Sequence, residues 1–195
     1  MYRFGKRVGD IVLSGLGLVV LSPLLLVLGI IVKCSSPGPV LFKQQRVGLH
    51  KKLFTMLKYR SMRTDAPAET PTHLLKDPST FITRSGRVMR NTSLDELPQL
   101  WNILIGDMSI VGPRPALWNQ DDLIAERDKY GANDIKPGLT GLAQIRGRDR
   151  LTAEQKSAFD GEYRENMSFA LDCRIIAKTV VVVLKGKDIG EGLEW

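Results

Sequence analysis

The sequence predicts a mainly helical α/β fold with short strands. We expect an N-terminal helix-break-helix that re-enters a membrane, followed by a small domain with amphipathic helices at the membrane surface. Two observations predict this fold. About 22 consecutive residues without a charge occupy positions 11–32. Behind them, short alternating apolar and polar runs are separated by glycine and proline, as strands and turns require. A chain of 195 residues is long enough for one compact domain with such an anchor.

The apolar run is long enough for a helix to cross the hydrocarbon core of a bilayer. A signal peptide fits less well, because no small-x-small cleavage site follows and the chain continues into a basic stretch. A buried core helix also fits less well, because so small a domain could hardly surround it. Ser22-Pro23 falls near the middle, where proline removes a helical hydrogen bond and serine can bond the freed carbonyls. We therefore expect the helix to break at this pair.

Positive charges flank the run on both sides, at Arg3, Lys6, Arg7, Lys33, Lys43 and Arg46. The positive-inside rule keeps both flanks in the cytoplasm, which a hairpin that enters and leaves by one membrane face satisfies. True spans with two positive flanks also occur, so a single span stays open as the alternative. The hairpin hypothesis places a membrane anchor at residues 1–35 and a cytoplasmic, membrane-associated domain at residues 36–195.

The composition narrows the class of function. Lys and Arg number 28 against 21 Asp and Glu, a net charge of +7 that favours anionic partners. Cys34 and Cys173 match no metal-binding spacing and suit a reducing compartment. With only two histidines, a histidine metal site or a Ser-His-Asp triad is disfavoured. Neither a Walker A nor a G-x-G-x-x-G pattern is present, which disfavours a P-loop or Rossmann nucleotide site.

The segment between Asp10 and Asp65 carries many cations and no acidic residue. Its stretches "VLFKQQRVG" and "KLFTMLKYRSM" interleave these cations with apolar residues, which predicts two short strands in a hairpin that turns at 48–50. Two interpretations stay open. The cations face an anionic leaflet, where each contributes about 1 kcal/mol, or Lys58 or Arg60 binds a phosphate.

A loop is predicted at residues 65–80, and three evenly spaced arginines follow it. Arg84, Arg87 and Arg90 recur every third residue, a spacing that we expect to align three guanidinium groups on one helix face. Such closely spaced cations repel one another unless they bind a polyanion such as a diphosphate, which arginine can hold with two parallel hydrogen bonds.

The adjacent acidic residues Asp95 and Glu96 admit two interpretations. Ser93 to Glu96 matches the S-x-x-E capping box of a helix start. However, Pro98 would interrupt a helix that began at Ser93. Alternatively the pair does chemistry on a phosphate, because an aspartate can attack phosphorus and form an acyl phosphate. One or two carboxylates with substrate oxygens are also a common Mg²⁺ site.

Later segments add further candidates. The turn "GDMSIVGPRP" presents Arg114, and the glycine-rich "KPGLTGLAQIRGRDR" holds Gln144 and Arg146. Both fit either ordinary turns or contacts to a phosphate, because glycine lets backbone approach a ligand closely. Residues 153–168 predict a polar surface helix. Residues 171–184 predict an amphipathic helix that lies on the membrane or closes the core.

Together these segments resemble a known family, the bacterial sugar transferases, also called monotopic phosphoglycosyl transferases. The likeness covers nearly the whole chain and is closest to the minimal, PglC-like members. It rests on six segments in order: "KRVGDIVLSGLGLVVLSPLLL", "LFKQQRVGL", "FTMLKYRSM", "RNTSLDELPQLWNILIGDMSIVGPRP", "KPGLTGLAQIRGR" and "SFALDCRIIAKT".

The resemblance implies a function and roles for several residues. It implies transfer of a sugar 1-phosphate from a UDP-sugar to polyprenyl (undecaprenyl) phosphate, with release of UMP and a covalent aspartyl intermediate. Asp95 matches the family's nucleophile, and Glu96 matches the residue that supports Mg²⁺ and the nucleophile. Lys58, Arg90 and Arg114 match the family's other motif cations. The reaction would begin polysaccharide, lipopolysaccharide or other glycoconjugate assembly at the cytoplasmic face of the bacterial inner membrane.

The expected partners are therefore the UDP-sugar, the polyprenyl phosphate and the anionic lipids of the inner leaflet. Nucleic acid is not expected, because few aromatic residues accompany the cations. Two other functions stay open: a non-enzymatic membrane module that binds anions, and a sugar-nucleotide hydrolase in which water replaces the lipid phosphate. The sequence selects neither the sugar nor the polyprenol length, and it leaves a homodimer open.

Overall fold

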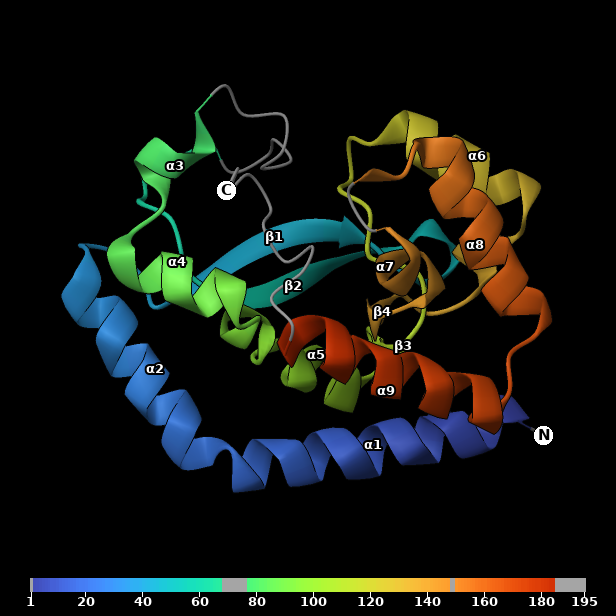
Figure 1. The fold of residues 1–195 in the computed structure, drawn as a ribbon, viewed down its shortest axis with the longest axis horizontal. Helices are drawn as coiled ribbons and strands as arrows, with labels where there is room; N and C mark the ends of the chain where they lie inside the picture. The colour runs from blue at the N-terminus through green and yellow to red at the C-terminus, as the bar shows by residue number, and fades with distance from the viewer. Residues whose placement is uncertain (1, 68–76, 148–149, 185–195) are drawn as a thin grey trace.

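Helices dominate the fold of the computed structural model, which describes residues 2–67, 77–147 and 150–184 (Figure 1). The predicted mainly helical fold with short strands is thereby confirmed. The elements in chain order are α1 (Tyr2–Val20), α2 (Ser22–Ser35), β1 (Leu41–Val47), η1 (Leu49–Lys51), β2 (Leu53–Tyr59), α3 (Pro78–Phe81), α4 (Arg84–Asn91), η3 (Leu94–Glu96), α5 (Gln99–Ile105), β3 (Ser109–Val111), α6 (Asp121–Lys129), η4 (Ala132–Asp134), β4 (Gly138–Thr140), α7 (Leu142–Arg146), α8 (Ala153–Glu165) and α9 (Phe169–Leu184).

The break predicted at Ser22-Pro23 is present, and helices α1 and α2 meet there at 64°. Proline has no N–H to donate to the carbonyl of Val19, and the Ser22 hydroxyl donates to that carbonyl at 2.8 Å instead. Among the described residues no single helix is long and apolar enough to cross a membrane. The bent pair meets the length and composition criteria only when its two limbs are taken together. Its re-entrant path stays a prediction.

The predicted hairpin is also confirmed. Strands β1 and β2 pair in antiparallel register from Leu41 opposite Tyr59 to Val47 opposite Leu53, and η1 joins them. Alternation along β2 buries Phe54 and Met56 in the core. The even-numbered Lys58 lies on that same inner face. The hairpin therefore directs Lys58 toward η3 and α5, which both contact β2.

Helix α1 is held on the domain by polar contacts near its N-terminus. Arg7 donates to the carbonyls of Ile103 and Leu104 at 2.6 and 2.7 Å, at the C-terminal end of α5. The buried carboxylate of Asp10 accepts from Ser109 Oγ at 3.1 Å and from the Ile110 N–H at 2.9 Å. These bonds satisfy helix-end carbonyls and strand-edge donors that would otherwise lack partners.

The second sheet pairs β3 and β4 in parallel, and α7, α8 and α9 lie on the same side of the molecule (Figure 1). Tyr163 of α8 and Ile175 of α9 are almost fully buried in the core cluster around Val111. Residues such as Phe169 and Val180 leave the opposite face of α9 exposed and apolar. The amphipathic helix predicted at 171–184 is therefore present, begins at Phe169 and closes the core.

Two sequence predictions need correction. Helix α8 is not simply a polar surface helix, because Ser157, Asp160 and Tyr163 of its inner face are buried. Asp160 pairs with the buried Arg127 of α6 at 2.7 Å, so a charged residue marks an internal face here. The predicted loop at 65–80 ends in the short helix α3 with a proline at its start, which suits an N-terminal turn. The part of that loop at 68–76 lies outside the described residues.

Candidate active site

The acidic pair Asp95-Glu96 lies in η3, a single 3₁₀ turn between α4 and α5. Ser93 has a left-handed backbone with φ 56° and makes no side-chain cap bond, so the predicted capping box is wrong. The left-handed residue turns the chain before η3, and Pro98 restarts the helix as the N-cap of α5. Asp95 is 7% exposed in this turn. The burial of a carboxylate outside a helix cap favours the chemical interpretation of the pair.

Two cations converge on Glu96. Lys58 Nζ lies 2.8 Å from Glu96 Oε1, and Arg114 Nη1 lies 3.4 Å from the same oxygen. The Lys58 and Glu96 side chains are each 13% exposed, and that of Arg114 is 24% exposed. The three residues come from β2, from η3 and from the turn after β3. The fold therefore brings two cations, far apart in sequence, to the acidic pair.

The predicted row of three arginines on one face is wrong. Arg84 and Arg87 are exposed on α4, whereas Arg90 is buried and donates to Ser61 Oγ at 3.4 Å. A three-residue step falls about 60° short of a full helical turn, so Arg90 points about 120° away from Arg84. Helix α4 packs tightly on the segment that contains Ser61, as shown by the collision that a Cβ on Gly86 would make with the Ser61 carbonyl. Only Arg90 of the three points into the protein.

The other predicted phosphate ligands Arg60, Gln144 and Arg146 make contacts within the fold, and their binding of a phosphate stays a prediction. The buried Arg60 donates to the carbonyls of Ser36 at 2.6 Å and of Pro37, at the C-terminal end of α2. There its charge complements the partial negative charge of the helix end. Gln144 donates to the Leu139 carbonyl at 3.0 Å. Arg146 makes two 2.9 Å bonds to Glu162 and covers the Phe159 ring. These three contacts fix α2, β4 and α7 within the fold.

Sequence reasoning missed two buried polar residues, Ser61 beside Arg90 and Gln99 three residues after Glu96. Ser61 receives the Arg90 bond, and nothing in its surrounding motif distinguishes it from any other serine after a strand. Gln99 is 2% exposed in the first turn of α5, and its Nε2 has no hydrogen-bond partner among the described residues. Its position directly after Pro98 is the one sequence signal that could have marked it as a polar residue at a helix start.

The carboxylates provide limited metal coordination on their own. Within residues 2–67, 77–147 and 150–184, no three His, Cys, Asp or Glu side chains gather closely enough to hold a metal ion. Mg²⁺ usually binds one or two carboxylates together with waters and substrate phosphate oxygens. Asp95 and Glu96 fit that pattern as hard oxygen ligands, and a bound phosphate would have to complete the coordination.

The comparison with known families is decisive for this chain. A family model described as "Bacterial sugar transferase" matches residues 1–186. The chain belongs to this family. The match includes the bent helix pair, the hairpin and the acidic pair, so the resemblance seen in the sequence is confirmed across nearly the whole sugar transferase chain.

Several curated proteins are similar to this sugar transferase along most of its length. "Uncharacterized sugar transferase EpsL" of Bacillus subtilis is 40% identical, with 97% of this chain and 90% of that protein covered. A "UDP-glucose:undecaprenyl-phosphate glucose-1-phosphate transferase" of Caulobacter vibrioides is 42% identical, over 92% of this chain and 69% of that protein. An "Undecaprenyl-phosphate galactose phosphotransferase" of Salmonella typhimurium is 39% identical over 94% of this chain, but only 41% of that longer protein is covered.

Proposed function

We propose that the protein transfers a sugar 1-phosphate from a UDP-sugar to undecaprenyl phosphate and releases UMP. The observation that carries the proposal is the buried Asp95 beside Glu96, on which Lys58 and Arg114 converge. The names of the Caulobacter and Salmonella relatives, one specifying glucose and the other galactose, support the donor and acceptor classes. Because those names differ in the sugar, the proposal covers a hexose donor without selecting one.

In the first proposed step, an Asp95 carboxylate oxygen attacks the β-phosphorus of the UDP-sugar. The bond from that phosphorus to the bridging oxygen breaks, and its electron pair leaves with UMP. This step forms an aspartyl sugar phosphate and divides one difficult transfer into two easier ones. With 7% of its surface exposed, Asp95 has little contact with water. That burial would protect the acyl phosphate from hydrolysis.

In the second step, a phosphate oxygen of undecaprenyl phosphate attacks the same phosphorus. The bond to Asp95 breaks, the carboxylate is regenerated, and undecaprenyl-diphospho-sugar is released. Lys58 and Arg114 would bind the diphosphate oxygens in both steps, because each already lies near a carboxylate oxygen at the pair. Mg²⁺ held by Asp95 or Glu96 would supply further charge neutralisation on the transferred phosphoryl group.

We also propose that the bent helix pair re-enters the cytoplasmic leaflet of the bacterial inner membrane. Apolar side chains along both limbs are exposed, including Leu16 and Val19 of α1 and Leu26 and Ile30 of α2. Trp101 of α5 and Phe169 of α9 add exposed apolar surface outside the pair. Exposed apolar surface of this extent is typical of a membrane interaction site. It would place the active site beside an acceptor whose lipid tail stays in the bilayer.

Intact-protein mass spectrometry tests the proposal. The purified protein is incubated briefly with Mg²⁺ and either UDP-glucose or UDP-galactose, without acceptor. We expect a mass gain of one hexose phosphate that peptide mapping places on Asp95 and that undecaprenyl phosphate removes. Asp95→Asn should abolish the adduct. The matched control Asp122→Asn should retain it, because Asp122 is exposed on α6. UMP release only with both substrates present, and no adduct under any condition, would replace the two-step mechanism with direct transfer.

A further inference from the structure

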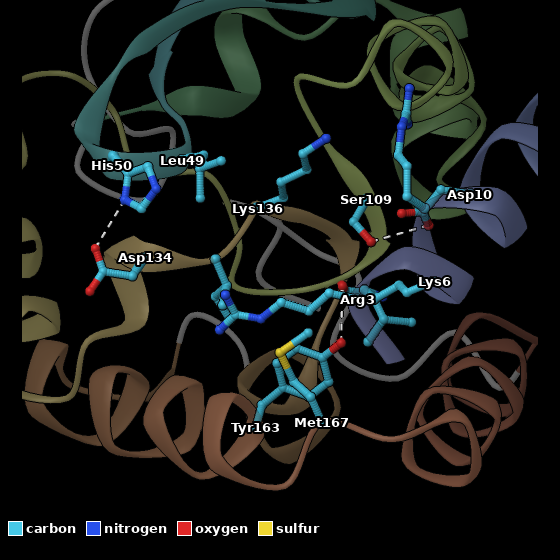
Figure 2. A pocket seen from close by; sticks show the side chains of 13 residues that line it. Arg3, Lys6, Asp10, Leu49, His50, Ser109, Asp134, Lys136, Tyr163 and Met167 are labelled. Atoms are coloured by element: carbon cyan, nitrogen blue, oxygen red, sulfur yellow. Dashed lines mark hydrogen bonds and ion pairs between the residues drawn. The ribbon is translucent and has the colours of Figure 1, made fainter. Parts of the chain in front are cut away.

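A second cluster of cations surrounds a cavity of about 190 Å³ between the first turns of α1 and the segments around β3 and β4 (Figure 2). None of Lys58, Asp95, Glu96 or Arg114 lines it. A cavity needs only about 10–15 Å³ to hold one water molecule. This cavity therefore has room for a group of several atoms.

The lining is rich in positive charge. Four lysines and arginines face two carboxylates, and His50 adds a titratable ring; the charged lining residues are Arg3, Lys6, Arg7, Lys136, Asp10 and Asp134. Figure 2 shows Arg3 and Lys6 entering from α1, and Lys136 from the segment before β4. Cations from these separate elements line one cavity, and lysine and arginine are the side chains that bind phosphate oxygens most strongly.

Local pairing removes only part of this charge. Lys6 Nζ pairs with Asp172 at 2.6 Å, and Asp134 Oδ1 lies 3.1 Å from His50 Nδ1. The Arg7 guanidinium bonds the Ile103 and Leu104 carbonyls at the C-terminal end of α5, whose partial negative charge offsets only part of its positive charge.

Arg3 and Lys136 have no hydrogen bond or ion pair with any of the described residues. Burial lowers the pKa of Lys136 most and the nearby charge of Arg7 lowers it further, whereas the carboxylates of Asp10 and Asp107 act in the opposite direction. With Lys6 paired to Asp172, the three cations Arg3, Arg7 and Lys136 outnumber the two carboxylates Asp10 and Asp134 in the lining, so an anion in the cavity would compensate a net positive charge.

We propose that this cavity binds the phosphate group of a small phosphate monoester or diester, at a site separate from the active site. Arginine and lysine together suit phosphate oxygens, with arginine providing paired donors and lysine a point charge. The apolar side chains of Leu49, Ile135 and Met167 also line the cavity and can contact the organic part of an ester. The phosphate comes from a phospholipid head group or from a soluble ester. The proposal does not depend on sugar-phosphate transfer.

Protection of Lys136 from acetylation tests the site directly. The full chain in detergent is treated briefly with acetic anhydride, and modification at each lysine is measured by mass spectrometry. The probes are dihexanoyl-phosphatidylglycerol, glycerol 3-phosphate and the zwitterionic dihexanoyl-phosphatidylcholine. We expect at least one of the two anions to slow Lys136 acetylation about fivefold or more. Lys129, which is 67% exposed, should change less than about 1.5-fold.

Each pattern of protection has a defined meaning. Protection by phosphatidylglycerol alone identifies a lipid head-group site, and protection by glycerol 3-phosphate identifies a site for soluble esters; both support the proposal. Protection by neither anion, or equal protection by phosphatidylcholine, overturns it. The full chain is used in every arm of the experiment. The ionic strength is held constant so that general charge screening is the same in each arm.

Three variants locate the bound phosphate. Arg3→Gln should weaken binding of the protecting anion about tenfold. Because the Arg3 side chain is exposed and unpaired, the variant should fold normally. Lys43→Gln removes another exposed cation, on β1, and should leave the affinity within about twofold. Equal weakening by both variants would show attraction to net charge alone and overturn the site. Arg114→Gln should leave Lys136 protection unchanged; its loss would place the anion in the active site instead and also overturn the proposal.

Discussion

Asp172 joins α9 to the start of α1, and its substitution should destabilise the fold measurably. One carboxylate oxygen accepts from Lys6 Nζ and from the Tyr2 hydroxyl, each at 2.6 Å. The other accepts from the Tyr163 hydroxyl at 2.7 Å. Asp172→Asn keeps one acceptor oxygen but replaces the other with an N–H donor and removes the negative charge. At least one donor, and the charge of Lys6, then lose their partner.

The expected loss follows from the burial of this network. Removing one partner of a buried ion pair costs about 3–5 kcal/mol, because the remaining charge stays without compensation. Lys6 and Asp172 side chains are each 11% exposed, so water can reach part of the network. We therefore expect Asp172→Asn to lower the free energy of unfolding by about 3 kcal/mol. For a domain of this size, that corresponds to a fall in Tm of roughly 6–12 °C.

Thermal unfolding in detergent, followed by circular dichroism, measures this effect. The control Asp65→Asn breaks an exposed pair with Arg63 and should cost less than about 1 kcal/mol. The double variant Lys6→Met with Asp172→Asn should be more stable than the sum of the single effects predicts, because it leaves no unpaired lysine. A Tm of Asp172→Asn within about 2 °C of wild type, or strict additivity in the double variant, would refute the reasoning.

Three further predictions concern other charged residues. Arg60→Gln should lower the free energy of unfolding by about 2 kcal/mol, because the Arg60 guanidinium bonds the end of α2. The KM for the UDP-sugar should stay unchanged. A changed KM with a normal Tm would identify Arg60 as a phosphate ligand instead. Glu96→Gln should reduce kcat more than tenfold in a UMP-release assay, because Lys58 and Arg114 lose their charged partner, and unchanged turnover would count against the cluster. Because the pKa of Lys136 lies below its ordinary 10.5, the native state binds fewer protons than the unfolded state between those two pKa values. In the absence of phosphate, the free energy of unfolding of wild type should therefore rise with pH up to about 10.5 relative to that of Lys136→Met. At pH 7 the Lys136→Met variant should be the more stable protein. Parallel pH profiles of the two proteins would contradict this expectation.

The predictions that succeeded rest on short-range patterns. Proline and serine side by side within an apolar run specify a break, because the missing N–H and the compensating hydroxyl both act on the Val19 carbonyl. Alternation of apolar and polar residues around Gly48 specifies a hairpin, and the register follows from the short connection. The resemblance to a family also grouped Lys58 and Arg114 with Glu96, and the structure places all three in contact, while their chemical roles stay a prediction.

The failures involve partners that local sequence does not show. The Ser93 backbone is left-handed, and that geometry removes the capping box that its neighbours otherwise match. Arg60 looks like a phosphate ligand beside Lys58, but its partners are carbonyls 23 and 24 residues earlier in the chain. Arg90 differs from Arg84 in its angle around α4. Two three-residue steps rotate the position of Arg90 toward the protein interior. A surplus of cations in a sequence therefore overstates how many of them can face a ligand.

The same contacts give the proposed re-entrant topology support that does not depend on the positive-inside rule. The start of α1 is tied to the domain by Lys6 and Arg7, which bond Asp172 and the end of α5. The end of α2 is tied to the same domain by Arg60, and Tyr59 donates to the Leu25 carbonyl at 2.7 Å. A simple span would carry one of these ends to the other side of the bilayer and break its contacts. Lys6 and Arg7 thus favour a hairpin because of their contacts with Asp172 and the end of α5. This argument holds even though the positive-inside rule alone also permits a span.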